Sequence, residues 1–424
     1  MRFRLIKCLL VFFILLMTNN AFTMDGIEPI TVNTFLVTVE NDYRLRSHQE
    51  LGDYLKTTSS STPYIDKIEF RTDTEDFEIA KQRCSLRFFL KGWGETKYNN
   101  MLTASIYDAF TLEHEVYYNK ALMKRYTLIL EYLESVELLK VMQELQVVYE
   151  DRINVLQMQT GTLSFDVSDY IAAENVYTEL RLDLVKIENR LTGIVHNIHL
   201  AADSEAEISF NDLNLITVEE IVREIDSLKF DPDFDNIYLK DRRNKIEIER
   251  INYNIEKAQE RDYLSYVEIQ YDRENYHESP KAYSVDIGFR LPFINSDQED
   301  INRRKSNYIE EKLRYEDERR ATSERIKSTL QSLNRHINQY KLLEDLRANF
   351  DARSPLRMYM QMEGINPLHL LEIRQSIINN DLQQDQIYFS IINEYVELMD
   401  LMDKLSAKPL RNYLSKGLES LYED

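Results

Sequence analysis

Two histidines have the spacing in this sequence that comes closest to a metal site. His196 and His199 lie three residues apart in a segment predicted to be helical, so both imidazole rings would project from one helix face. A zinc ion usually takes about four ligands from Cys, His and acidic side chains, and no nearby cysteine or closely spaced acid completes such a set. The two interpretations are a metal ion and a polar helix face, and the incomplete ligand set favours the second.

Motifs of catalysis are missing from the 424-residue sequence. It contains no Gly-rich phosphate loop, no H-E-x-x-H motif, no paired cysteine motif and no nucleophile elbow. Its net charge of −21 would repel the phosphates of a nucleic acid, whereas it suits a solvated acidic surface or an acidic conduit. We therefore expect a protein that is not an enzyme and that has no catalytic residue, cofactor, metal ion or nucleic-acid partner.

The N-terminus has the pattern of a secretory signal peptide. Three basic residues precede an apolar run from Leu9 to Met17, which is too short for a membrane helix, and small or polar residues follow it. We predict a signal peptide over residues 1–23, and its removal would leave a net charge of 49 − 73 = −24. Cys84 would then be the one remaining cysteine, which excludes an internal disulfide framework. No other apolar stretch approaches the roughly 20 residues of a membrane helix, so membrane contact would require strands or a surface.

The elements that position these residues are separated by glycine and proline. Neither residue type occurs between Gly94 and Gly161 or between Pro292 and Pro355, and at about 1.5 Å per residue each gap allows a helix of roughly 90 Å. The pattern of elements repeats, with an offset of 364 − 161 = 203 residues between two glycines that follow long helices. We therefore predict a mainly α protein built from a duplicated unit of strand hairpin and long helix. The predicted parts are a first repeat 24–200, with strands 65–72 and 84–91, a long helix 95–158 and a helix 167–200; an acidic connector 201–235; a second repeat 236–405, with strands 264–272 and 283–291, a long helix 296–354 and a helix 370–405; and a C-terminal tail 406–424.

The four predicted strands alternate apolar and polar residues. They could form soluble hairpins that rest on a helix, or a wall between water and lipid. Charged residues on the polar faces, aromatic residues on the apolar faces, and Trp93, Tyr98 and Phe293 just past strand ends favour the membrane interpretation. Four strands cannot close a barrel, because about eight are needed, so several chains would have to share one. The residues predicted to face the membrane are Leu86, Phe88, Val267, Ile269, Val285, Ile287 and Phe289.

Three stretches carry a resemblance to a known family. A strand ending in "RLPFINS" runs directly into the helix "DQEDINRRKSNYIEEKLRYEDERRATSERI", and the turns "GTLSFDVSDYIAAEN" and "GINPLHLLEIRQSI" each begin at a glycine and continue into a helix. Together with the order of elements along nearly the whole mature chain, they resemble the TolC-like outer-membrane efflux proteins. The resemblance implies a homotrimer whose chains each give four strands to one β-barrel in the outer membrane of a Gram-negative bacterium. Their helices would continue as an α-barrel tunnel through the periplasm.

The resemblance also implies a role for the two turns, which start at Gly161 and Gly364. They would form the periplasmic entrance, which meets an adaptor and an inner-membrane transporter, and acidic residues there would act as a selectivity gate. Aligned at the two glycines, His369 lies opposite Asp166, so the second turn would gain positive charge in mild acid. The acids could instead only stabilise the starts of the helices through the helix dipole. The gate candidates are Asp166, Asp169, His369 and Glu372.

The function that the resemblance implies is a passive outer-membrane conduit of a tripartite efflux or type I secretion system. The alternative is a periplasmic coiled-coil adaptor or scaffold protein without a pore. An adaptor should carry segments rich in Gly and Val around one helical hairpin, whereas this sequence has two duplicated hairpins and few strands. The sequence therefore favours the conduit.

Overall fold

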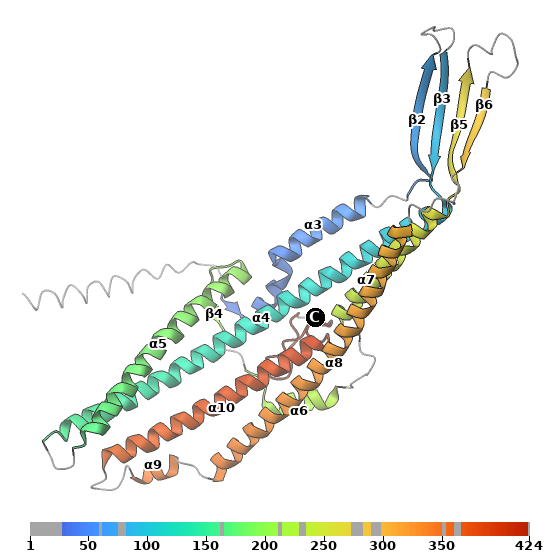
Figure 1. The fold of residues 1–424 in the computed structure, drawn as a ribbon. Coiled ribbons are helices and arrows are strands. Elements are labelled where there is room, and N and C mark those ends of the chain that lie inside the picture. The colour runs from blue at the N-terminus through green and yellow to red at the C-terminus, as the bar shows by residue number, and fades with distance from the viewer. Residues whose placement is uncertain are drawn as a thin grey trace, which may run out of the picture.

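The computed structural model describes residues 28–58, 62–74, 82–161, 165–210, 214–228, 235–272, 283–289, 298–349, 353–359 and 366–422. The predicted signal peptide 1–23 and the second turn glycine, Gly364, lie outside these residues, as does Phe293. The described chain is elongated, with a β-sheet at one end and long helices through the rest of its length (Figure 1).

The sheet has four antiparallel strands in the order β2–β3–β5–β6. The strands are β2 (Ile65–Thr74), β3 (Gln82–Leu90), β5 (Leu264–Asp272) and β6 (Tyr283–Phe289). Each hairpin belongs to one of the two predicted repeats, and the β3–β5 pairing joins the repeats. β-Branched and aromatic residues alternate with polar ones in these segments, which suits a pleated sheet with two different faces.

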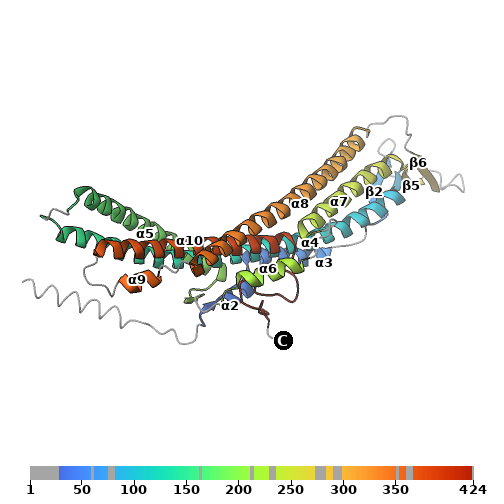
Figure 2. The same cartoon turned by 90° about the horizontal axis from the view of Figure 1, so that it is seen from below.

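Five long helices form an open layer. They are α4 (Trp93–Met158), α5 (Val167–Ala202), α7 (Ile237–Glu260), α8 (Gln298–Asn349) and α10 (Pro367–Leu401). Far from the sheet, α5, α4, α10 and α8 lie side by side in that order, and nearer the sheet α7 lies between α4 and α8 (Figures 1 and 2). The 66 residues of α4 give it a length of roughly 100 Å. None of the helices in the described residues has an apolar stretch long enough to cross a membrane.

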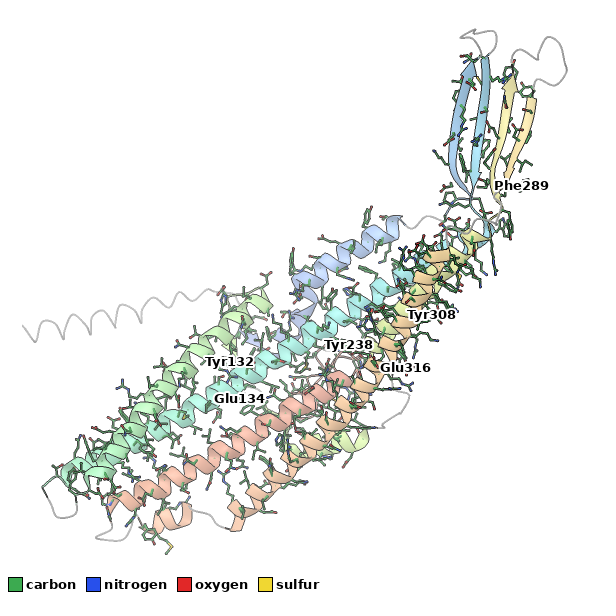
Figure 3. All side chains as sticks on the ribbon, viewed as in Figure 1. Tyr132, Glu134, Tyr238, Phe289, Tyr308 and Glu316 are labelled. Carbon is green, nitrogen blue, oxygen red and sulfur yellow. The ribbon has the colours of Figure 1, made fainter. Side chains whose placement is uncertain are left out.

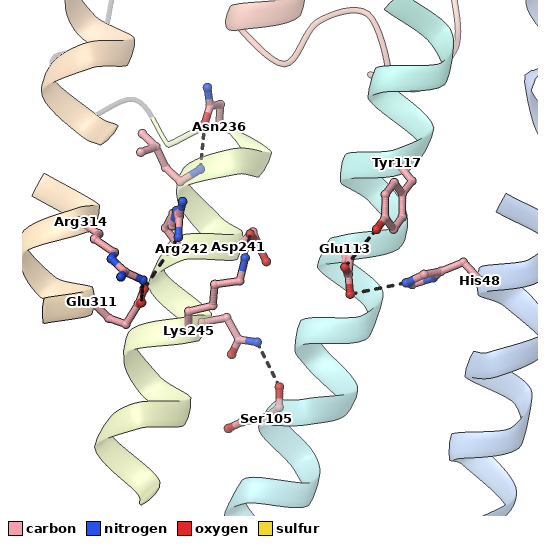
Figure 4. Close-up of polar contacts among 12 residues, drawn as sticks. His48, Ser105, Glu113, Tyr117, Asn236, Asp241, Arg242, Lys245, Glu311 and Arg314 are labelled. Atoms are coloured by element: carbon pink, nitrogen blue, oxygen red, sulfur yellow. Dashed lines mark hydrogen bonds and ion pairs between the residues drawn. The ribbon is translucent and has the colours of Figure 1, made fainter. Parts of the chain in front are cut away.

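Side-chain caps and ion pairs fix the position of α7 in this layer. The side chain of Asn236 accepts a hydrogen bond from the backbone N–H of Leu239 at 3.0 Å, which satisfies an amide that has no partner inside the helix. Glu311 on α8 lies 3.8 Å from Arg242 on α7 and 2.6 Å from Arg314 on its own helix (Figure 4). These contacts link the two helices that descend from the second hairpin.

The main hydrophobic core lies in the middle of the molecule, where segments distant in sequence meet α4 and α10. These segments are α2 (Val32–Val37), η1 (Thr38–Asn41), α6 (Val218–Ser227) and the tail after α10, together with β1 (Ile30–Thr31), which pairs in parallel with β4 (Ile208–Ser209). The tail is joined to the connector by a hydrogen bond from the Ile216 N–H to the Leu414 carbonyl at 2.8 Å. Fully buried side chains of this core include Phe35, Leu36, Leu122, Tyr126, Ile129, Phe210, Ile392 and Tyr395.

A buried arginine ties α4 to η1 and to the end of α5. Arg125 on α4 is 1% exposed, and its guanidinium donates to the carbonyls of Thr38 at 3.1 Å and Ala201 at 2.8 Å. Asp42 lies 3.6 Å away and supplies the counter-charge. Burial lowers the pKa of Arg125, while the charge of Asp42 opposes that change.

The structure differs from the predicted boundaries in a few places. The predicted helix 296–354 is α8, which ends at Asn349 and is followed by a separate short helix, α9 (Arg353–Tyr359). Pro355 lies in the first turn of α9, where its missing N–H is tolerated, whereas it would break a continuous helix. The connector 201–235 contains β4 and α6, and the described part of the tail, residues 406–422, packs against it. Five other elements differ from their predicted ranges only at their ends. In the structure they are the strands 65–74 and 82–90 and the helices 93–158, 167–202 and 367–401.

Candidate functional site

The strand pairing sorts the side chains of the sheet onto two faces. One face is apolar, and the other carries charged and polar residues in register across all four strands. The central rows of the apolar face are Ile68, Phe88, Val267 and Ile287, and then Phe70, Leu86, Ile269 and Val285. The central row of the polar face is Glu69, Arg87, Glu268 and Asp286.

The apolar face is the exposed one. Phe70 is 66% exposed, Val285 62% and Phe289 67%, and Phe289 lies at the end of β6 nearest the helices (Figure 3). A soluble hairpin would instead rest this face on a helix, which is the alternative that the sequence left open. A continuous set of large exposed apolar side chains is typical of a surface covered by lipid or by a partner.

The seven residues predicted to face a membrane all lie on this apolar face. Leu86, Ile269, Val285, Ile287 and Phe289 are exposed. Phe88 and Val267, in the two central strands, are half-buried by their neighbours.

The polar face is held together by charges that are paired across the strands. Arg87 Nε donates to Glu268 Oε2 at 2.7 Å, and both side chains are less than 20% exposed. The guanidinium of Arg87 also lies 4.1 Å from the centre of the Tyr266 ring. A Cβ at Gly288 would come within 2.2 Å of the Tyr266 ring, so the absence of a side chain there makes room for the ring. The sheet therefore has a polar face whose charges are ordered by hydrogen bonds and ring contacts.

The first turn lies at the far end of the long helices, between α4 and α5. Gly161 has a φ of +89°, a left-handed conformation that glycine adopts without strain. The Asp166 carboxylate accepts a hydrogen bond from the Ser168 N–H at 2.8 Å and is the N-cap of α5. Asp169 lies in the first turn of the same helix and is exposed. Asp166 thus has a structural role at the helix start, whereas the carboxylate of Asp169 faces solvent.

The second turn ends at α10, whose N-cap is Asn366. One turn into the helix, His369 Nδ1 lies 3.4 Å from Glu372 Oε2, and Glu372 also lies 3.8 Å from Arg152 on α4. Gln375 donates to the Tyr149 hydroxyl at 2.7 Å, which adds a second link between α10 and α4.

The helix caps give a different correspondence between the two turns from the glycine alignment. Asp166 and Asn366 are both N-caps, so Asp169 and His369 are each the third residue after a cap. The helices that follow the two turns, α5 and α10, lie on opposite sides of α4. Within the described residues, no hydrogen bond or ion pair joins Asp166 or Asp169 to His369 or Glu372. One chain therefore does not bring the four candidates into a single cluster.

The two spaced histidines, His196 and His199, lie in the last turns of α5. His199 Nδ1 donates to the Ser204 carbonyl at 2.8 Å, where α5 ends. Among the described residues, no group of three or more His, Cys, Asp and Glu side chains is arranged to hold a metal ion.

A half-buried carboxyl group in the middle of the molecule was not found from the sequence. Asp400 near the end of α10 accepts a hydrogen bond from Asn119 Nδ2 at 2.6 Å, and the Tyr238 hydroxyl lies 3.3 Å from the same nitrogen. Burial raises the pKa of Asp400 to about 6, and the nearby charge of Asp403 adds to the rise. An acid within the apolar stretch "YVELMDLM" was the available signal.

An open layer of long antiparallel helices that carries a four-stranded sheet at one end is the fold of the TolC-like outer-membrane channels. The crystal structure of CusC, described with its transmembrane channel formation, matches with a TM-score of 0.65 and 12% identity, over 88% of this chain and 91% of CusC. The CmeC outer-membrane channel of Campylobacter jejuni matches with a TM-score of 0.64 and 12% identity, over 91% and 90% of the two chains. The open state of the MtrE outer-membrane channel of Neisseria gonorrhoeae matches with a TM-score of 0.65 and 9% identity, over 91% of each chain.

These comparisons confirm the predicted resemblance at the level of the fold. No family model matches the sequence, and no curated protein sequence matches it significantly. At identities near one residue in ten, the likeness extends to the arrangement of helices and strands along nearly the whole of each chain.

Proposed function

We propose that this protein is the outer-membrane channel of a tripartite efflux or secretion system in a Gram-negative bacterium. Three copies would share one β-barrel, and their helices would form a tunnel through the periplasm that ends at an adaptor and an inner-membrane transporter. The channel is passive and has no catalytic role. The observation that carries the proposal is the exposed apolar face of a four-stranded sheet that has two open edges.

The open edges require more than one chain. Backbone groups at a sheet edge need hydrogen-bond partners within the hydrocarbon of a bilayer, and only a closed barrel supplies them all. A barrel needs about eight strands or more, so one chain with four strands cannot close it. Three copies would give a barrel of roughly twelve strands, which is within the range of known membrane barrels.

The helical layer has open edges on the same two sides of the molecule. β2 and α5 lie at one side, and β6 and α8 at the other (Figure 1). Both edge helices expose large apolar side chains away from their neighbours in the chain, as expected for helices that pack against another copy. These side chains are Ile171, Leu182 and Val185 on α5 and Ile309, Leu313, Leu342 and Leu346 on α8.

The matched structures favour the channel over the adaptor. CmeC and MtrE are described as outer-membrane channels, and the share of each chain that matches is about nine-tenths. The adaptor alternative has no comparable support from the fold.

The proposal assigns the periplasmic entrance to the two turns and the gate to residues near them. Asp169 and Glu372 are the acids chosen for the test, because both are exposed and neither caps a helix, whereas Asp166 is the N-cap of α5. Asp169→Asn together with Glu372→Gln should lower the preference of the channel for cations, measured as a shift of the reversal potential in a salt gradient. Asp166→Asn keeps the cap and is the matched control.

Reconstitution of the purified mature chain in a planar lipid bilayer tests the proposed function. The expected result is a series of discrete conductance steps. The same preparation should be a trimer when its mass is measured in detergent. A monomer that stays soluble without detergent and gives no conductance would overturn the proposal.

A further inference from the structure

The two edges of the sheet carry opposite charge on the polar face. On β2, Lys67 and Arg71 flank Glu69, with nitrogen to oxygen distances of 2.5 and 2.8 Å, so this edge has two cations for one acid. On β6, Asp286 is the one charged residue of the described strand, because its neighbours on the same face are Ser284 and Gly288. In the rows that cross all four strands, the β2 edge therefore has a charge of +1 and the β6 edge a charge of −1.

Asp286 has an acid beside it within the sheet rather than a cation. Its register partner on β5 is Glu268, which is already engaged by Arg87 at 2.7 Å. Like charges opposite each other in a sheet are unfavourable. Among the described residues, no hydrogen bond or ion pair involves Asp286, and its side chain is exposed. The two other acids of β2 lie outside these rows: Asp73 is opposite Arg83, and Asp66, at the irregularity near the start of the strand, lies 3.2 Å from Lys91.

We propose that Asp286 of one copy pairs with Lys67 and Arg71 of the adjacent copy. This pairing would favour the head-to-tail contact, β6 of one chain beside β2 of the next, through which the chains close the barrel. The inference rests on the proposed function, since only a shared barrel brings the β6 edge of one chain to the β2 edge of another. Strand direction agrees, because β2 and β6 run antiparallel when the alternation along β2–β3–β5–β6 is continued into a second copy.

The charges also disfavour the competing assembly. In a two-fold pairing, an edge of one chain would meet the same edge of the second chain, so two positive β2 edges or two negative β6 edges would lie side by side. In a head-to-tail ring, each positive edge meets a negative one, and the contact is repeated at every interface. The edge charges thus select the ring that a closed barrel requires.

A double-mutant cycle tests the pairing. Asp286→Lys makes the β6 edge positive, and Arg71→Glu makes the β2 edge negative, so either change alone places like charges at each interface. Each single variant should weaken trimer formation about tenfold in low salt, because a modest repulsion is repeated around the ring. The double variant Asp286→Lys with Arg71→Glu exchanges the signs of the two edges and should restore the trimer. Asp226→Lys, at an exposed position of α6 far from the sheet, makes the same change of charge and should have no effect.

Cross-linking provides a second measurement that does not depend on repulsion. In a Cys84→Ser background, Asp286→Cys combined with Lys67→Cys or Arg71→Cys should give covalent dimers and trimers with a short thiol-specific cross-linker. Asp286→Cys alone should stay monomeric on a denaturing gel. Suppose that the wild type forms a conducting trimer, but that no cross-links form and the double variant does not restore the trimer. That result would overturn the pairing and leave the proposed channel intact. A wild-type monomer without conductance would overturn both.

Discussion

The half-buried carboxyl group of Asp400 should make the protein less stable as the pH rises from about 4 to about 6. In the folded chain this group keeps its proton up to a pH of about 6, because burial opposes its ionisation, whereas its ordinary pKa is 3.8. Below pH 4 the group is neutral in both states, and above pH 6 only the folded state bears the energy of a buried charge. A difference of about two pKa units corresponds to about 3 kcal/mol of unfolding free energy per chain.

Asp400→Asn removes the ionisation and keeps a side chain of the same shape beside Asn119. Unfolding by urea in detergent should show nearly equal stability of variant and wild type at pH 4. The variant should become more stable than the wild type by up to about 3 kcal/mol at pH 7. Asp226→Asn, at an exposed position, should show no such trend. A difference between Asp400→Asn and wild type that is the same at pH 4 and pH 7 would refute the reasoning that burial controls this group.

Three further predictions concern the two faces of the sheet and the core. Ile269→Lys, on the exposed apolar face, should destabilise the protein folded into lipid vesicles by about 2–4 kcal/mol. Gln270→Lys, at the next residue and on the polar face, should be tolerated, and equal effects of the two variants would contradict the assignment of the faces. Tyr126→Phe should lower the unfolding free energy by about 1–3 kcal/mol, because the Tyr126 hydroxyl donates to the Arg411 carbonyl at 2.9 Å. Tyr395→Phe should be neutral or stabilising, because the buried Tyr395 hydroxyl has no partner in the described part of the chain. Arg125→Met should lower the unfolding free energy in urea by about 3 kcal/mol, since it leaves two carbonyls without their donor and Asp42 without its counter-charge. A smaller loss would show that the segments are held by apolar contacts alone.

The sequence was most informative where the pattern is local. Side chains alternate in direction along any strand, so residues such as Val285 and Ile287 share a face in any sheet that contains them. Helix length followed from the absence of glycine and proline over long stretches, and α4 extends over nearly the whole interval from Gly94 to Gly161. The order of these elements was sufficient for the resemblance in fold that the comparisons confirm.

Contacts between distant segments could not be predicted in this way. The β1–β4 pair joins two strands of two residues each, and no periodicity can be read from a strand of that length. The tail after α10 is anchored by single hydrogen bonds such as that between Ile216 and Leu414, which depend on where the chain returns. The environment of Asp400 is likewise set by Asn119 and Tyr238, which belong to two other helices.

The two turns show how a duplicated sequence can build unequal ends. The first passes from Met158 to Val167 in a short connection, whereas the second leaves α8 at Asn349 and reaches α10 at Pro367 through α9. Because α8 stops early, α9 packs on α10 in its place, and a cavity of about 520 Å³ lies between α4, α9 and α10. Arg357 and Arg374 line it together with Glu144 and Asp381, so the lining carries both signs of charge, whereas the first turn presents Asp169. In the proposed trimer the entrance would therefore alternate between a short acidic turn and a longer one of mixed charge, and a repeat of the sequence does not imply a repeat of the charge.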